Sequence, residues 1–276
     1  MEKSILFTAI QAALQAGAEI MKVYTDPNAD FEIERKADNS PLTIADRKSH
    51  EVIASRLSQT PYPILSEEGK KIPTETRTGW TELWVVDPLD GTKEFIKRNG
   101  EFTVNIAYVR NSTPEAGVIY VPVTEELYFA DKNLGAFKAE NKDGLLARIA
   151  TAEVSAKSLD QLVEASDHLP YTKEHDTFRI VASRSHLNAE TEAYIKQMET
   201  EHERVETVSK GSSLKLCLIA EGKADVYPRF APTMEWDTAA GDAIVRATGK
   251  NVFQAQTDEP LQYNKEDLLN PWFIAL

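Results

Sequence analysis

The 276-residue sequence contains a single cysteine, Cys217, so no disulfide can form within the chain. This fits a reducing compartment, and we expect the cytoplasm. Long apolar runs are lacking too, and none approaches the roughly 20 apolar residues of a membrane-spanning helix. Polar residues such as Glu2, Gln11 and Glu19 interrupt the first apolar stretch, unlike a signal peptide. We expect no integral membrane segment and leave peripheral association with the inner membrane face open.

Positive charge is scarce as well. Lys and Arg number 31 against 44 Asp and Glu, which gives a formal net charge of -13. A surface of this sign repels the phosphate backbone of a nucleic-acid polymer, so we exclude DNA and RNA as partners. A small phosphorylated ligand would still bind if clustered basic residues or a divalent metal ion supplied a local cation. With 42% apolar and 27% charged residues, the chain can form the sizeable core of a globular protein.

The first half of the chain predicts an α+β arrangement. Apolar residues from Leu6 to Tyr24 recur at three- and four-residue spacing, as in an amphipathic helix, and a second helical pattern follows Thr43 and includes Leu57. Apolar stretches indicate buried strands and, further on, consecutive antiparallel strands. These strands are expected at 63–66, 83–86, 102–109, 116–121 and 126–130.

The second half predicts strands that alternate with helices, as in an α/β fold. The strands are expected at 178–182, 205–208, 224–227 and 251–254, and the helices at 190–198, 212–221 and 237–247. Because the pattern weakens at 148–161, we divide the chain into residues 1–155 and 156–276. Internal repeats, low-complexity tracts and long Gly/Ser linkers are lacking, which favours two halves that pack tightly together.

The most informative stretch is an apolar strand that ends in two carboxylates, Asp87 and Asp90, followed by Gly91 and Thr92. Mg²⁺ prefers oxygen ligands, and the Leu89 carbonyl can add a third oxygen. The amides that follow can donate to a bound oxyanion. The same letters also suit an ordinary turn, because Asp-Gly is common in hairpins and Asp-Pro at loop starts. On these residues alone, both interpretations stay open.

Other acidic residues favour the metal interpretation. Glu67 also follows an apolar strand, and its charge would be costly beside Asp87 and Asp90 unless a cation neutralised all three. Asp237 opens an Ala-rich helix, and Asp46 lies in the first turn of an earlier one. An acidic residue there more often caps the helix than binds a metal. For these two residues both roles stay open.

Together these residues resemble the signature of the lithium-sensitive, Mg²⁺-dependent phosphomonoesterase superfamily, which includes inositol monophosphatase and fructose-1,6-bisphosphatase. That signature is a Glu, a strand followed by Asp-Pro-hydrophobic-Asp-Gly-Thr, and a distant Trp-Asp followed by small residues. The matching segments here are 66–69, 86–92 and 236–241, and they extend over nearly the whole chain. The resemblance implies a layered α-β-α-β-α sandwich with the site between two halves, in agreement with the α+β and α/β patterns.

Within the superfamily, the sequence is most similar to the CysQ-type 3′(2′),5′-bisphosphate nucleotidases. After the Gly-Thr it has Lys-Glu-Phe, where inositol phosphatases usually have Thr-Asn-Phe. Just before the Trp-Asp, inositol phosphatases typically offer a Glu to a sugar hydroxyl, whereas this chain has Arg229, which suits a second phosphate. Two nearby prolines restrict the backbone, so the direction of that side chain stays open. The likeness rests on residues 91–106, 181–186, 211–215 and 221–229.

The resemblance implies a site for two Mg²⁺ ions, with a third that binds more weakly near Glu67. Glu67, Asp87 and the Leu89 carbonyl would hold one ion. Asp87, Asp90 and Asp237 would hold the second, so that Asp87 bridges the two. Two cations a few ångströms apart can stabilise both the attacking and the leaving oxygen of an in-line phosphoryl displacement.

The resemblance also implies the catalytic and substrate-binding residues. Thr92, bonded to Asp46, would orient the attacking water and help to deprotonate it, and the amides of Gly91 and Thr92 would bind the phosphate. Basic and polar side chains of the second half would surround the nucleotide and its other phosphate, with Asp237 near the sugar. The full set expected around the substrate is Glu67, Leu89, Asp90, Gly91, Thr92, His186, Ser212, Lys215, Arg229 and Asp237.

The activity implied is removal of the 3′-phosphate of adenosine 3′,5′-bisphosphate to give AMP, and the same reaction on its sulfated form. It would recycle a by-product of sulfate activation and sulfotransfer. Two alternatives stay open: an inositol or sugar-phosphate monoesterase with the same metal site, and a non-catalytic nucleotide sensor. A sensor has no need of the water-activating pair Thr92 and Asp46, which favours an enzyme. The oligomeric state and the preference between 3′ and 2′ phosphates are left open.

Overall fold

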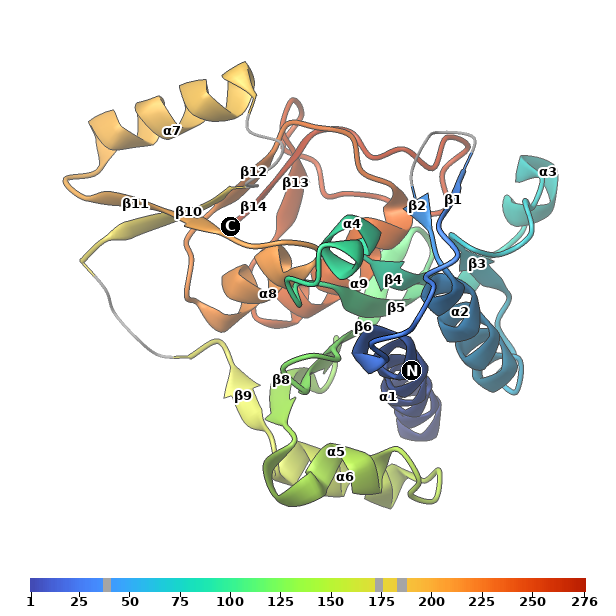
Figure 1. Cartoon of the computed structure of the whole chain (residues 1–276). Helices are drawn as coiled ribbons and strands as arrows, with labels where there is room; N and C mark the ends of the chain where they lie inside the picture. The colour runs from blue at the N-terminus through green and yellow to red at the C-terminus, as the bar shows by residue number, and fades with distance from the viewer. Residues whose placement is uncertain (37–40, 172–175, 183–187) are drawn as a thin grey trace.

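A computed structural model of the chain describes residues 1–36, 41–171, 176–182 and 188–276. Its centre is a seven-stranded sheet in the order β3-β4-β5-β6-β7-β8-β9 (Figure 1). β3 and β4 run parallel, and every other neighbouring pair is antiparallel. The strands are β3 (Ile64–Ser66), β4 (Glu82–Asp90), β5 (Thr103–Arg110), β6 (Thr113–Val121), β7 (Glu126–Asp131), β8 (Gly135–Glu140) and β9 (Asp167–Leu169).

Helices cover the first face of this sheet. Side chains alternate across β4, so that Trp84 and Val86 join the core beneath these helices, whereas Leu83 and Val85 join the core on the opposite face. Because both faces are buried, the strand has a continuous apolar sequence. The helices of this layer are α1 (Lys3–Thr25), α2 (Ile44–Leu57), α5 (Leu145–Ile149) and α6 (Ala156–Glu164).

The second face of the sheet is covered by α8 (Leu214–Glu221) and α9 (Glu235–Ala247). α9 approaches β6 so closely that a Cβ at Gly117 would lie 2.3 Å from the Ala240 carbonyl oxygen. Only glycine permits this contact between helix and strand. It brings the start of α9 close to the end of β4, where the predicted ligands lie.

Short strands form the next layer. β10 (Phe178–Ala182) pairs in parallel with β11 (Val205–Ser209), and a bridge between Ile180 and Val226 connects them to β12 (Tyr227–Arg229). β14 (Phe273–Ala275) lies between β12 and β13 (Val252–Gln254), and α7 (Ala189–Glu201) lies outside these strands (Figure 1). The layers therefore alternate as α-β-α-β-α, which confirms the predicted fold. The remaining elements are β1 (Glu34–Arg35), β2 (Pro41–Leu42), α3 (Thr74–Arg77), α4 (Thr92–Ile96) and η1 (Lys142–Gly144).

Most of the predicted helices and strands are present, and the differences lie where apolar periodicity is weak. The strand expected at 224–227 is β12, which begins only at Tyr227. The sequence predicted neither β8 nor β14. α6 and β9 both follow residue 155, yet α6 packs on α1 and β9 pairs with β8. A division at residue 155 stays a prediction.

α1 is the one helix in the described part of the chain that is long and apolar enough to cross a membrane. The sequence analysis expected no integral membrane segment, and that expectation stays a prediction. Of the most apolar window of α1, 67% is buried in the fold, as in the core helix of a soluble protein. Its apolar face packs on the sheet, which is sufficient to explain its composition.

Candidate active site

A bulge in β4 turns Asp87 and Asp90 toward the same side of the sheet. Asp87 pairs with Asn105 and Asp90 pairs with Thr103, so β4 has one residue more than β5 between these pairs. In a regular strand, residues three positions apart point to opposite faces. The extra residue reverses this alternation, and Pro88, which cannot donate a ladder hydrogen bond, lies within the bulge.

Glu67 reaches the same edge because β3 and β4 run parallel. Ser66 pairs with Val86, and the Glu67 amide donates to the Val86 carbonyl at 3.1 Å. Parallel neighbours present their carboxyl ends together, where ligands of α/β proteins bind. The Lys36 ammonium donates to Glu67 at 2.7 Å and also contacts Glu68. The sequence analysis gave Lys36 no role, because nothing in the local pattern connects it with residue 67.

Two helices supply the other carboxylates, and in both the acidic residue is the third of the helix. The Thr43 amide donates to Asp46 Oδ2 at 2.7 Å, and the Met234 amide donates to Asp237 Oδ2 at 2.8 Å. Each carboxylate therefore caps its helix with one oxygen. The other oxygen of Asp46 accepts a bond from Thr92 Oγ1 at 3.0 Å. Capping and a role in the site are thus compatible.

Asp87, Asp90 and Asp237 each offer a carboxylate oxygen, and these three oxygens lie within 4.8 Å of one another. Burial, followed by repulsion from Glu67, raises the pKa of Asp87 well above its usual value. Burial and the charge of Asp90 raise the pKa of Asp237 to about 8. A bound cation would relieve this repulsion, and an all-oxygen donor set suits a hard divalent ion. The residues present therefore fit a metal site.

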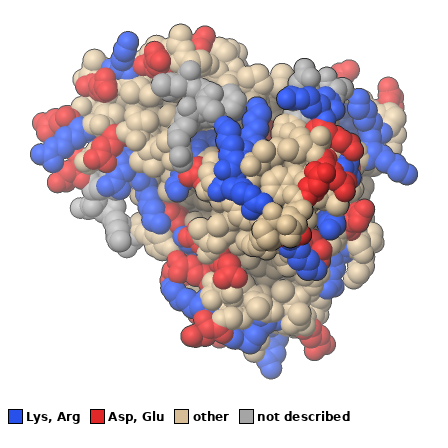
Figure 2. Space-filling model, in the orientation of Figure 1, with Lys and Arg blue, Asp and Glu red and all other residues tan. Residues whose placement is uncertain are grey.

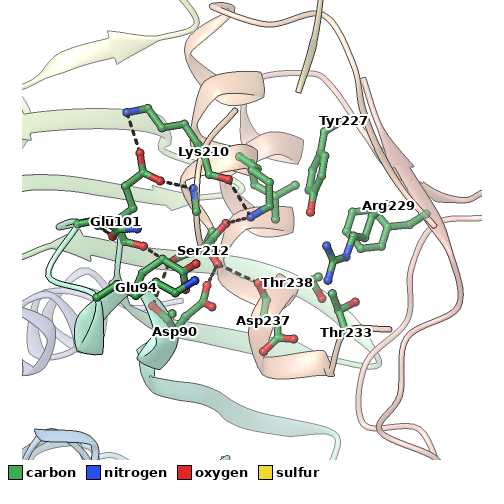
Figure 3. A pocket seen from close by; sticks show the side chains of 18 residues that line it. Asp90, Glu94, Glu101, Lys210, Ser212, Tyr227, Arg229, Thr233, Asp237 and Thr238 are labelled. Carbon is green, nitrogen blue, oxygen red and sulfur yellow. Dashed lines mark hydrogen bonds and ion pairs between the residues drawn. The ribbon is translucent and has the colours of Figure 1, made fainter. Parts of the chain in front are cut away.

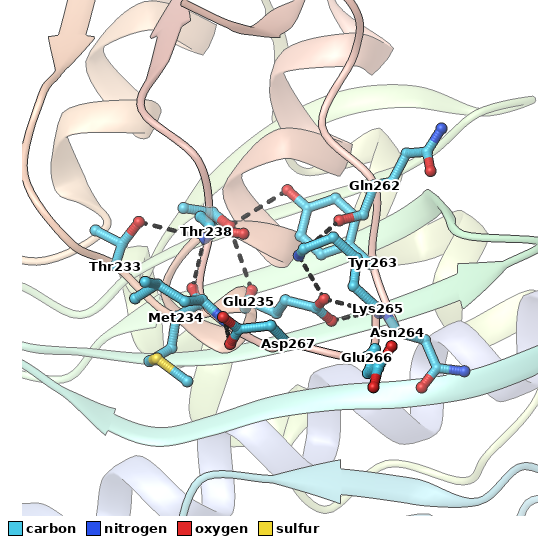
Figure 4. Close-up of polar contacts among 12 residues, drawn as sticks. Thr233, Met234, Glu235, Thr238, Gln262, Tyr263, Asn264, Lys265, Glu266 and Asp267 are labelled. Carbon is cyan, nitrogen blue, oxygen red and sulfur yellow. Dashed lines mark hydrogen bonds and ion pairs between the residues drawn. The ribbon is translucent and has the colours of Figure 1, made fainter. Parts of the chain in front are cut away.

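Buried contacts hold the first turn of α9 and with it Asp237 (Figure 4). Glu235 accepts bonds from the main-chain amides of Asn264 at 2.6 Å and Lys265 at 3.0 Å. Its carboxylate also accepts a bond from the Lys265 ammonium at 2.6 Å. Asn270 Nδ2 donates to the main-chain carbonyl just before Glu235 at 2.7 Å. Residues 264–270 thereby hold the first turn of α9 and fix the position of the Asp237 carboxylate.

The turn between β4 and α4 depends on Gly91. Its φ is 94°, and a Cβ there would lie 2.6 Å from Ser212 Oγ. Ser212 Oγ lies 2.9 Å from the Asp90 carbonyl oxygen and 2.7 Å from the Glu101 carbonyl oxygen, and its hydroxyl donates to one or the other. These contacts place the loop before α8 directly against the turn. The predicted residue Ser212 thus joins the site through hydrogen bonding of its hydroxyl to main-chain carbonyl oxygens.

A cavity of about 340 Å³ opens beside the carboxylates, with Asp90 and Asp237 at one end and Tyr227 and Arg229 at the other (Figure 3). Lys215 also lines it. Burial lowers the pKa of Lys215 to about 8, although the negative charge of Asp90 opposes this shift. The Lys215 ammonium donates to the main-chain carbonyl three residues earlier at 2.6 Å.

Arg229 lines this cavity, which answers the question that the flanking prolines left open. Its Nη2 donates to the Pro232 carbonyl at 3.1 Å. Its Nε is shielded from solvent and has no hydrogen-bond partner among the described residues. Because the guanidinium carries a permanent positive charge and Arg229 lines the cavity, an anionic oxygen would be favoured beside it.

Lys and Arg side chains also gather over α4 in the middle of the face shown in Figure 2. Lys97 follows α4 and also lines the cavity. The strongly negative chain therefore carries a local basic region beside its acidic cluster. This is the arrangement that a phosphorylated ligand requires on a protein of this net charge.

The described residues bring the predicted metal ligands and the Thr92–Asp46 pair to one edge of the large sheet. Predicted substrate residues Ser212, Lys215 and Arg229 line the adjoining cavity. His186 lies outside the described residues. Side chains of the site that the sequence analysis missed are Lys36, Glu101, Asn105, Lys210 and Ser213.

Comparisons with known proteins agree with this geometry. Residues 1–272 match the family described as the inositol monophosphatase family. The chain is 45% identical over 266 residues to the 3′(2′),5′-bisphosphate nucleotidase CysQ of Escherichia coli (strain K12), covering 95% of this chain and 96% of that protein. It is 32% identical to the nucleotidase CysQ of Haemophilus influenzae, with 100% and 94% covered.

Solved structures give the same result. The chain is similar to the crystal structure of CysQ from Bacteroides thetaiotaomicron, a bacterial member of the inositol monophosphatase family, with 58% identity and a TM-score of 0.90 over 100% of this chain and 97% of that one. The extragenic suppressor protein suhB from Bartonella henselae has a TM-score of 0.71 at 24% identity, with 98% and 92% covered. At that identity the likeness shows the fold alone.

Proposed function

This chain belongs to the inositol monophosphatase family, and from that premise we propose that it is a 3′(2′),5′-bisphosphate nucleotidase that removes the 3′-phosphate of adenosine 3′,5′-bisphosphate. The enzyme would also act on the sulfated form of this nucleotide. Two relatives with this activity in their names are 44% and 45% identical over 95% of the chain, which supports an enzyme rather than a sensor. The family is metal-dependent, and its substrates are small phosphorylated molecules.

One observation carries the choice of substrate. The cavity has the carboxylates of Asp90 and Asp237 at one end and the positively charged Arg229 guanidinium at the other. A molecule with two phosphate groups can place one phosphate at each end. An inositol monophosphate would leave the basic end facing hydroxyl groups, which bind a cation more weakly than a phosphate does.

We assign two Mg²⁺ ions to the carboxylates. Glu67, Asp87 and the Leu89 carbonyl would hold one, Asp87, Asp90 and Asp237 the other, and a third would bind weakly near Glu67. When bound, the metal ions supply Lewis-acid chemistry, which acidifies water and neutralises phosphoryl oxygens.

The protein's own residues handle the proton and the phosphate. Thr92 Oγ1 donates a hydrogen bond to Asp46, so its lone pairs can accept a hydrogen bond from the attacking water; as the water's proton moves to Oγ1, the hydroxyl's own proton would pass to the Asp46 carboxylate. The amides of Gly91 and Thr92 begin α4 and can donate to the phosphoryl oxygens. Ser212, Lys215 and Arg229 would bind the other phosphate. The role of His186, the cytoplasmic location and any peripheral membrane contact stay predictions.

The test compares substrates and a ligand variant. Phosphate release is measured with Mg²⁺ on adenosine 3′,5′-bisphosphate and on inositol 1-phosphate at equal concentration, for the wild type and for Asp90→Asn. We expect turnover of the bisphosphate by the wild type and a loss of at least about 10²-fold in Asp90→Asn. Preference for inositol 1-phosphate would end the nucleotide assignment. Equal background release by both proteins would favour a sensor.

A further inference from the structure

We infer that Ser213 is a positioning residue that fixes the Asp90 carboxylate relative to Asp237, and that Asn105 holds Ser213 in place. The inference rests on the metal site proposed above and goes beyond it, because neither residue belongs to the proposed ligand set. Both are buried, with exposed fractions of 3% for Ser213 and 1% for Asn105. Water therefore does not compete for their hydrogen bonds.

Ser213 lies between two ligands that come from distant parts of the chain. Its Oγ is 2.8 Å from Asp90 Oδ2 and 2.9 Å from the Asp237 main-chain carbonyl oxygen. Both partners are acceptors, so the hydroxyl donates to one or the other. Ser213 is also the residue just before α8. The end of β4 and the starts of α8 and α9 therefore meet at one hydroxyl group.

Asn105 donates to both Ser213 and Asp90. Its Nδ2 lies 2.9 Å from Ser213 Oγ and 3.3 Å from Asp90 Oδ2. Its Oδ1 accepts a bond from Thr103 Oγ1 at 2.9 Å. Since Oδ1 is held by Thr103, the amide group must point its two N–H bonds toward Ser213 and Asp90. The bonds thus run from Thr103 to Asn105 and from Asn105 both to Asp90 Oδ2 and to Ser213, whose hydroxyl donates in turn to Asp90 or to the Asp237 carbonyl.

This polar chain lies where the sheet is otherwise apolar. Thr103 and Asn105 alternate on β5 with Val104 and Ile106, and all four side chains are buried. A buried amide group costs free energy unless its hydrogen bonds are made. Asn105 makes them because the bulge of β4 turns Asp90 toward Thr103 and Asn105. Asn105 Nδ2, together with Ser213 when its hydroxyl donates to Asp90, restricts the orientation of the Asp90 carboxylate. Ligands oriented in this way bind their metal more tightly.

The experiment measures metal binding directly. Mn²⁺ serves as the probe, and its binding is followed by the loss of the electron paramagnetic resonance signal of the free ion. The variants are Ser213→Ala, Asn105→Ala and the double variant, with Asp90→Asn as the variant that lacks a ligand. Ser158→Ala is the matched control, because Ser158 is also a buried serine whose hydroxyl donates to a main-chain carbonyl, that of Glu153 at 2.6 Å.

We expect Ser213→Ala to raise the Kd for Mn²⁺ by about 10-fold or more, with a matching rise in the Mg²⁺ concentration that half-saturates phosphate release. The double variant should bind little worse than Ser213→Ala alone, because both residues act through one network. Ser158→Ala should bind as the wild type does. Thermal unfolding of each variant shows that it is folded before Mn²⁺ is added.

The two possible failures are distinguishable. If Ser213→Ala binds Mn²⁺ as tightly as the wild type while Asp90→Asn binds weakly, the positioning role is overturned and the proposed function stands. If Ser213→Ala and Asn105→Ala weaken binding in an additive way, a shared network is overturned. If the wild type neither binds Mn²⁺ nor releases phosphate, the proposed function fails and this inference fails with it.

Discussion

Thr92 Oγ1 donates a hydrogen bond to Asp46 Oδ1 at 3.0 Å, across 46 positions of the sequence. Asp46 is 1% exposed, and its other oxygen is held by the first turn of α2. Burial raises its pKa, and the bonds from Thr43 and Thr92 oppose that rise. The threonine hydroxyl is therefore held in one orientation by a carboxylate that is itself fixed.

Removal of this hydroxyl should lower the rate and leave substrate binding nearly intact. We expect Thr92→Val to reduce kcat by about 10²- to 10⁴-fold, because the proton acceptor for the attacking water is lost. KM should stay within a few-fold of the wild-type value, and Thr92→Ser should restore most of kcat. Steady-state kinetics with Mg²⁺ provide the check. A large rise in KM with an unchanged kcat would assign Thr92 to binding.

The stability of the metal-free protein should fall as the pH rises. The pKa of Asp237 is about 8 in the folded chain against an ordinary value of 3.8, so between these values the folded state holds the proton that the unfolded state has lost. Stability is highest below this window and decreases through it. The melting temperature is measured across this range with EDTA and with saturating Mg²⁺.

With Mg²⁺ the decline should be smaller, because the ion binds the ionised carboxylates and stabilises the folded state more at higher pH. Asp237→Asn is the control, and its melting temperature with EDTA should depend less on pH than that of the wild type. A wild-type melting temperature that rises with pH in EDTA would contradict the like-charge cluster.

Lys215 should make the use of a bisphosphate pH-dependent. Its pKa is about 8, lowered by burial, so the free enzyme loses this charge as the pH rises through that value. We expect kcat/KM for adenosine 3′,5′-bisphosphate to fall above about pH 8. Lys215→Arg keeps its charge and should lack this decline. The same profile in both proteins would show that another group titrates.

Arg229 should separate substrates with two phosphates from those with one. We expect Arg229→Ala to raise KM for adenosine 3′,5′-bisphosphate by about 10- to 100-fold, the range of a lost charge-assisted hydrogen bond. KM for adenosine 3′-monophosphate, which lacks the second phosphate, should change little. Steady-state kinetics on both substrates test this, and an equal loss on both would place Arg229 outside the second phosphate site.

Gly117 should not tolerate a side chain, although it lies far in sequence from the turn between β4 and α4. A Cβ there would overlap the Ala240 carbonyl of α9, so Gly117→Ala should destabilise the fold by about 1 to 3 kcal/mol. Gly79→Ala is the control, since its nearest neighbour is 4.0 Å away. Urea unfolding measures both. Equal midpoints for the two variants would contradict the close packing of α9 on β6.

The sequence predicted the proposed ligands more completely than the residues that orient them. Asp87 and Asp90 could be found because an apolar strand leads into them, and Asp237 because small residues follow it. Ser213 and Asn105 lie inside stretches that resemble the family, yet a serine before a helix and an asparagine in a strand have no local pattern that marks them as buried. Their role depends on which segments the fold places against them.

The sequence by itself determined where most helices and strands form, because apolar periodicity is a local property, and it determined which oxygen-bearing side chains are available for a metal. Tertiary structure alone decided that those oxygens converge. A spacing of three residues in a strand would separate Asp87 from Asp90, and only the bulge against β5 reverses this. The parallel pairing of β3 with β4 and the contact of α9 with Gly117 then bring in Glu67 and Asp237. These are long-range contacts, and their partners are fixed only when the two faces of the sheet are packed.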